Sequence, residues 1–67
     1  MSVRLNVPAI KKLLAEKSLT ASALARLSGV SRNSISTILN RGTCSAVNAG
    51  KLAKALDVDI EAIWRED

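Results

Sequence analysis

The sequence predicts an all-α protein, a compact bundle of five helices within 67 residues. Three observations lead to this prediction. Apolar residues recur three and four positions apart along most of the chain, which is the spacing of one helix face. Trp64 is the only aromatic residue, so the core must be built from aliphatic side chains that suit close helix packing. Residues that cap or end helices separate the apolar segments, and the short length predicts one domain over residues 1–67.

The first helix is expected to follow Asn6, which can cap it, with Pro8 tolerated in the first turn. Its apolar stripe consists of Ile10, Leu13 and Leu14. Before it, apolar residues alternate with polar ones, at Val3, Leu5 and Val7. This period of two predicts a short strand or an extended N-terminal arm, whose partner the sequence does not identify.

The second half of the chain predicts two further helices. Ser45 can cap the fourth helix after a loop at residues 43–44, and its core face is Ala49, Leu52, Ala53 and Leu56. Gly50 inside this helix suggests the close approach of another backbone. Asp59 can cap a last short helix, which buries one side through Ile60, Ile63 and Trp64.

Residues 20–40 carry the pattern that bears most directly on function. A helix is expected after Thr20 to about Ser28, burying Leu24, Ala25 and Leu27. Gly29 can turn its end through positive φ, Ser31 can cap the next helix, and Gly42 can end that helix. A tight turn between two short helices with small residues at the crossing predicts a helix-turn-helix unit, which places its second helix in the major groove of DNA.

The helix from Arg32 to about Asn40 separates two faces when wound at about 100° per residue. Ile35, Ile38 and Leu39 form the apolar face. The polar face, within about 140° of Arg32, has no acidic residue. Its candidates for base contacts are Arg32, Asn33, Ser36 and Thr37. Arg can pair with guanine, Asn with adenine, and a Thr methyl can touch thymine. The alternative is an ordinary polar face that meets only water.

The charge is unevenly distributed. Residues 1–55 carry nine basic residues against one acid, Glu16, whereas residues 56–67 carry five acids against Arg65. One end should therefore face a polyanion, unless this is merely an uneven solvated surface. With no His, no acid in residues 17–56 and one Cys, the chain lacks the groups for an enzyme, a metal site or a cofactor site. Cys44 is expected to be a loop or buried thiol in a reducing cytoplasm, and no apolar run is long enough to span a membrane.

Over about residues 7–64 the chain resembles the lambda-repressor-like, Cro-type helix-turn-helix family of small phage and bacterial regulators. The resemblance is carried by Leu19-Thr20, Leu24-Ala25, Ser28-Gly29-Val30-Ser31, Ser34-Ile35, Ile38, Gly42 and residues 51–58. It implies a five-helix bundle whose third helix enters the major groove. It also implies phosphate contacts by Ser31, Asn40, Arg41 and Thr43. Where the family often has a glutamine, this chain has Ala21, so that phosphate contact is either missing or supplied by Thr20 or Ser22. Asp57 replaces a common glycine and is expected to adopt the left-handed conformation.

We therefore expect a sequence-specific DNA-binding regulator, a repressor, that binds a palindromic operator as a homodimer in the cytoplasm, associated with the nucleoid. No small-molecule ligand is expected. The dimer candidates are Val47, Ile60, Ile63 and Trp64, all of which can equally well complete the core of the monomer. The alternative function is a protein-interaction module of the same fold, an antitoxin or modulator that binds DNA weakly.

Overall fold

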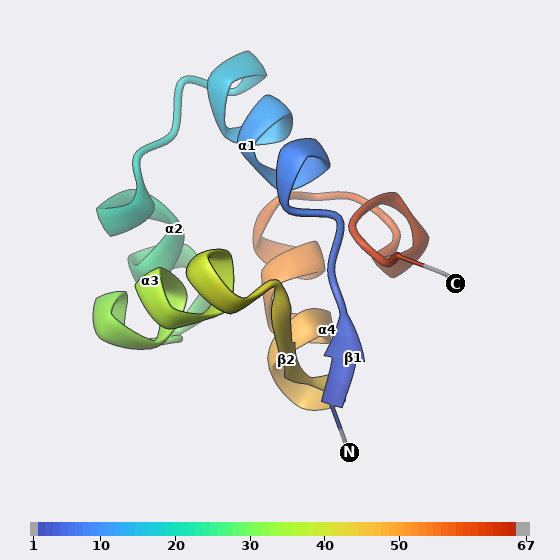
Figure 1. Ribbon diagram of the computed structural model, residues 1–67. Helices are drawn as coiled ribbons and strands as arrows, with labels where there is room; N and C mark the ends of the chain where they lie inside the picture. The colour runs from blue at the N-terminus through green and yellow to red at the C-terminus, as the bar shows by residue number, and fades with distance from the viewer. Residues whose placement is uncertain (1, 66–67) are drawn as a thin grey trace.

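The computed structural model describes residues 2–65. In that range the chain forms four α-helices, a two-stranded sheet and one turn of 3-10 helix (Figure 1). In chain order these are β1 (Ser2–Arg4), α1 (Val7–Glu16), α2 (Ala21–Ser28), α3 (Arg32–Arg41), β2 (Thr43–Ser45), α4 (Ala46–Ala55) and the 3-10 turn η1 (Ile60–Ala62).

Each α-helix begins where the sequence predicts, because a polar side chain caps it. The capping residues are Asn6, Thr20, Ser31 and Ser45. In every case the side-chain oxygen accepts a hydrogen bond, 3.1 Å long, from the backbone amide three residues later. These bonds satisfy amides that have no partner within the helix, so the starts of all four helices are determined locally.

Residues in the left-handed conformation end all four helices. Gly29 ends α2 at φ 74° and Gly42 ends α3 at φ 75°, as predicted. Asp57 follows α4 at φ 57°, which confirms the expectation for this position. The end of α1 was not anticipated, because Ser18 takes this role at φ 55°. There the Leu19 amide donates to the Leu14 carbonyl at 2.8 Å, closing the last turn.

The core lies between the helices and is wholly apolar. Its fully buried large side chains are Ile10, Leu24, Ile35, Leu52, Leu56 and Ile63. Two expectations are wrong. Leu27 is 60% exposed, because α2 packs on α3 and α4 and no element covers this position. Gly50 is exposed, and a Cβ added there would have no atom within 4 Å, so this glycine permits no close approach within the subunit.

The sheet corrects the all-α prediction. β1 and β2 are antiparallel, and Val3 lies opposite Cys44, while Arg4 lies opposite Thr43. The N-terminal arm thus has a partner, namely the segment between α3 and α4 that was expected to be a loop. The alternation of apolar and polar residues in the arm corresponds to alternating burial, since Leu5 is buried while Arg4 is exposed. Two segments about 40 residues apart close one side of the core.

The prediction of a fifth α-helix is also wrong. The segment after Asp59 forms only the 3-10 turn η1, and the Asp59 side chain makes no capping bond. A segment this short does not form an α-helix unless packing supports it. Here packing requires extended backbone instead, because Trp64 forms a bridge with Leu5 and the Arg65 amide donates to the Arg4 carbonyl at 3.0 Å.

Candidate nucleic-acid interface

The turn between α2 and α3 positions the candidate interface. The amide of Gly29 donates to the Ala25 carbonyl at 3.0 Å, and the chain then reverses into α3 through Val30, which is buried. Ala25 is half-buried. Its small side chain permits α2 and α3 to approach closely, as the sequence predicts. The α2–turn–α3 unit is therefore held by the core on its inner side.

Helix α3 divides into a packed face and an exposed face. Ile35 and Ile38 are 1% and 5% exposed, so they anchor the helix in the core. The predicted base-contact residues all lie on the exposed face; they are Arg32, Asn33, Ser36 and Thr37. Folding uses none of these four side chains for packing in the core. A rigid helix thus presents hydrogen-bonding groups of intermediate length to the outside.

Two internal hydrogen bonds decide which polar groups remain available. The Thr37 hydroxyl donates to the Asn33 carbonyl at 3.0 Å, so Thr37 offers a methyl group and an acceptor. The Ser31 hydroxyl donates to Ser34 Oγ at 2.8 Å. Ser34 is exposed and no described bond uses its own hydroxyl proton. Ser34 is therefore a better donor than Ser31 at the start of α3, and its spacing of three from the cap was the signal that could have identified it.

The other predicted phosphate contacts lie at the start of α2 and at the end of α3. Thr20, Ser22, Asn40 and Arg41 are exposed, and Thr43 is half-buried in β2. The Thr20 oxygen accepts the Ala23 amide as a cap, which leaves its proton available for donation. These residues frame both ends of the α2–α3 unit. The start of α2 and the end of α3 are thus polar and free of acids.

The structure adds two residues to the face that sequence reasoning did not. A recess between α3 and the start of α4 is lined by Asn33, Thr37, Ser45 and Asn48, and the buried Cys44 also contributes to its lining. Asn33 and Thr37 belong to α3, Ser45 is the last residue of β2 and the cap of α4, and Asn48 belongs to α4. Burial raises the pKa of the Cys44 thiol, which keeps it protonated at neutral pH. Ser45 and Asn48 extend the candidate interface beyond α3.

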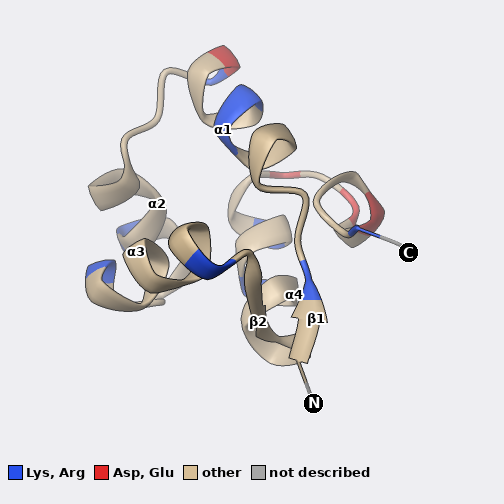
Figure 2. Ribbon diagram, viewed as in Figure 1, with Lys and Arg blue, Asp and Glu red and all other residues tan. Residues whose placement is uncertain are grey.

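Acidic residues are absent from the elements that form the candidate interface. Helices α2, α3 and α4 and strand β2 contain no Asp or Glu, whereas Asp57, Asp59 and Glu61 follow in sequence. Figure 2 shows the acidic residues at the end of α1 and around η1, and basic residues on all four α-helices and on β1. A polyanion would meet the α3 side favourably and be repelled from η1.

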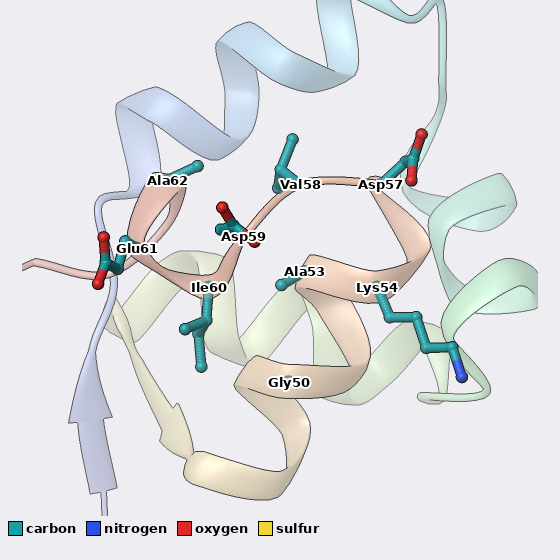
Figure 3. Close-up of a pocket in the computed structure, with 9 residues that line it drawn as sticks. All are labelled: Gly50, Ala53, Lys54, Asp57, Val58, Asp59, Ile60, Glu61 and Ala62. Atoms are coloured by element: carbon teal, nitrogen blue, oxygen red, sulfur yellow. The ribbon is translucent and has the colours of Figure 1, made fainter.

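The four residues predicted to form the dimer interface differ in their exposure to solvent. Val47 is 69% exposed and Trp64 is 39% exposed, while Ile60 is half-buried against the core. Ile63 is fully buried, so its side chain completes the monomer core and is not available to a partner. Figure 3 shows a groove between α4 and η1 that Ile60 helps to line together with Asp59 and Glu61.

Among residues 2–65 there is no group of three or more metal-binding side chains. None of the helices in this range has the length and apolar character needed to cross a bilayer.

The chain matches the model of a known protein family. The model of the Cro/C1-type HTH DNA-binding domain matches residues 9–64, which include all four α-helices except the first two residues of α1. No curated protein and no solved structure matches the chain.

Proposed function

Because the chain belongs to the Cro/C1-type helix-turn-helix DNA-binding domain family, we propose that it is a transcriptional repressor that recognises specific duplex DNA sequences with α3. The observation that carries this proposal is the exposed polar face of α3, anchored from behind by Ile35 and Ile38. A helix held in this way can enter the major groove, where each base pair presents a distinct set of donors and acceptors.

Base recognition is assigned to four residues, Arg32, Asn33, Ser36 and Thr37. Arg32 has five donors and suits guanine O6 and N7, and Asn33 suits adenine N6 and N7. The Thr37 hydroxyl is already bonded within α3, so its methyl group is proposed to contact thymine. Each good bidentate pair should contribute about 1–3 kcal/mol of discrimination against a wrong base.

Phosphate contacts are assigned to the helix ends around that face. They are Thr20, Ser22, Ser31, Asn40, Arg41 and Thr43, with Ser34 added from the structure. The first-turn amides of α2 and α3 favour an incoming phosphate. The hydroxyl groups of Thr20, Ser22 and Ser34 can donate to it, whereas the Ser31 hydroxyl already donates to Ser34. These contacts carry no base preference, but they fix the register of α3 in the groove.

We also propose that two copies bind a palindrome. One recognition helix reads few base pairs, and two helices about 34–36 Å apart read half-sites on one face of the duplex. The protein measures 29 × 21 × 19 Å, so two copies in contact reach this spacing when α3 lies beyond each centre. The exposed side chains of Val47 and Trp64, with Ile60, are the proposed contacts. Ile63 is omitted because it belongs to the core.

The repressor proposal is tested by selecting binding sites from random duplexes and measuring affinity for the selected site at several salt concentrations. Neutralisation of several phosphates predicts a slope of log affinity against log salt near −0.9 per contact, hence a loss of orders of magnitude between about 50 and 200 mM salt. A flat dependence and no enriched site would instead support the protein-interaction module.

Residue-level variants then separate the two contact classes. Arg32→Ala should lose about 1–3 kcal/mol at the selected site and relax base choice, whereas Arg41→Ala should weaken binding to all sequences and flatten the salt slope by about one unit. Unchanged specificity in Arg32→Ala would show that the register assigned to α3 is wrong.

The dimer is tested separately, by sedimentation of the protein free and on the selected duplex. Val47→Asn should weaken binding to the full palindrome but not to a half-site, and Leu27→Asn is the matched control, because Leu27 is also exposed but lies on α2. A monomer in both sedimentation measurements at high micromolar concentration would remove the dimer from the proposal.

The site of action is proposed to be the cytoplasm, where such a protein meets DNA. No enzymatic step is proposed, because the interface has no acid–base pair.

A further inference from the structure

We infer that Lys11, on α1, is a further DNA contact, which binds a backbone phosphate beside the C-terminal half of α3. The inference rests on the proposed DNA-binding function and deepens it, because it names a contact outside the helix-turn-helix unit. Lys11 and Lys12 are neighbours of the same type in the sequence. Only the fold distinguishes them, and it brings one of the two to the edge of the candidate interface.

One side of α1 faces the end of α3. Val7, the first residue of α1, has its Cγ2 atom 3.6 Å from the position that a Cβ at Gly42 would occupy, and Gly42 ends α3. Lys11 is four residues after Val7, so it lies one turn further along on the same side of α1. Lys12 is turned about 160° from the buried Ile10 and therefore lies on the side of α1 opposite the core.

Lys11 lines an open recess of about 520 Å³, and the other residues of its lining all belong to α3, namely Ser36, Thr37, Leu39 and Asn40. The Lys11 side chain is exposed, and no Asp or Glu of the described residues lines the recess. Helix α3 itself carries charges only at its two ends, because residues 33–40 include no Lys, Arg, Asp or Glu. Lys11 therefore adds a cation beside the uncharged middle of the face that is proposed to read DNA.

The position of Lys11 indicates a phosphate and not a base edge. A helix about 10–12 Å across fills a major groove that is about 12 Å wide. A side chain carried by a neighbouring element therefore meets the sugar-phosphate backbone that borders the groove. The lysine ammonium is a compact charge on a flexible stem, which suits a single phosphate oxygen. Asn40 lines the same recess and is already a proposed phosphate contact, so Lys11 extends that part of the interface onto α1.

The salt dependence of binding tests the charge. Lys11→Gln should reduce the magnitude of the salt slope by about 0.9, so its affinity for the selected duplex should fall about 3.5-fold less than that of wild type between about 50 and 200 mM salt. Lys11→Arg keeps the charge and should retain the slope. Lys12→Gln is the matched control, because it removes the same charge from the next residue of the same helix and should leave the slope nearly unchanged. Lysine and glutamine have similar helix propensities and both positions are exposed, so these variants should keep the wild-type Tm.

Neutral replacement of single phosphates tests the position of the contact. Each phosphate of the selected duplex is replaced in turn by an uncharged methylphosphonate. For each bound copy, one replacement should weaken the binding of wild type and of Lys12→Gln while leaving that of Lys11→Gln unchanged, because this variant has already lost the contact. Lys11→Gln should still select the same base sequence as wild type, since a phosphate contact carries no base preference.

The inference fails if wild type binds with a steep slope while Lys11→Gln and Lys12→Gln change that slope alike. It also fails if Lys11→Gln relaxes base choice and no methylphosphonate position distinguishes it from wild type, because Lys11 would then contact a base. In both of these results the wild-type protein still binds specific DNA, so the proposed function stands. A wild-type protein that binds no duplex would overturn the proposed function itself and this inference with it.

Discussion

Replacing Ser31 by alanine tests whether the start of α3 is held as the structure indicates. The Ser31 oxygen accepts the Ser34 amide at 3.1 Å and donates to the Ser34 hydroxyl at 2.8 Å. The side chain is exposed, so Ser31→Ala leaves no cavity, and the cost is that of a lost helix cap, about 1 kcal/mol. For a domain of this size that loss lowers Tm by about 4–8 °C, which far-UV circular dichroism measures directly.

A second substitution at the same position separates folding from binding. Ser31→Asp keeps a capping oxygen and places a negative charge at the positive end of α3, so stability should equal or exceed that of wild type. The same carboxylate would face a DNA phosphate, and two such charges about 4 Å apart repel by about 1–4 kcal/mol. The variant should therefore bind duplex DNA at least about tenfold more weakly.

Two results would refute this reasoning. An unchanged Tm in Ser31→Ala would mean that the side chain does not stabilise α3. Wild-type affinity in Ser31→Asp would mean that the start of α3 does not lie against a phosphate, whatever the stability of the variant. Ser31→Thr is the control for both, since threonine keeps the hydroxyl and adds one methyl group at an exposed position.

Three further predictions concern glycine, leucine and cysteine. Gly50→Ala should raise the free energy of unfolding by about 0.5–1 kcal/mol, because Gly50 is helical and the added methyl meets no atom within 4 Å, whereas Gly29→Ala, at φ 74°, should lower it by about 1–2 kcal/mol. Urea denaturation measures both, and changes of the same sign would contradict the backbone argument. Leu24→Ala should cost about 2–5 kcal/mol and Leu27→Ala less than about 1, since Leu24 is fully buried and Leu27 is 60% exposed; equal losses would be inconsistent with this packing. Because burial raises the pKa of the Cys44 thiol, iodoacetamide should alkylate the native protein more slowly than the urea-unfolded protein, and stability should fall as pH rises through the ordinary range of a free thiol. Equal alkylation rates in the two states would show that the thiol is accessible.

Local interactions explain why much of the fold could be predicted. A helix cap depends on residues three apart, so Asn6, Thr20, Ser31 and Ser45 could be identified without tertiary information. The exposed face of α3 follows from helical periodicity and the buried positions of its isoleucines. The polar residues of the candidate interface were accessible to the same reasoning, because one helix carries the four proposed base contacts.

Features that depend on distant segments were missed. The pairing of Val3 with Cys44 leaves no mark on residues 43–45 that distinguishes a strand from a loop. The shortening of the fifth helix follows from the bridge between Leu5 and Trp64, which a local pattern cannot contain. The Ser31 hydroxyl donates to Ser34 and so has no proton left for a phosphate. This bond depends on side-chain geometry that residue spacing does not specify.

The bridge between Leu5 and Trp64 also has a consequence for synthesis on the ribosome. Leu5 and Ile63 are both buried, so the core stays incomplete until the segment around residue 64 has left the exit tunnel. The α2–α3 unit emerges long before that point, with its apolar faces still uncovered. Folding of this protein should therefore be completed after translation of the domain, and a nascent chain stalled before residue 60 should be sensitive to protease.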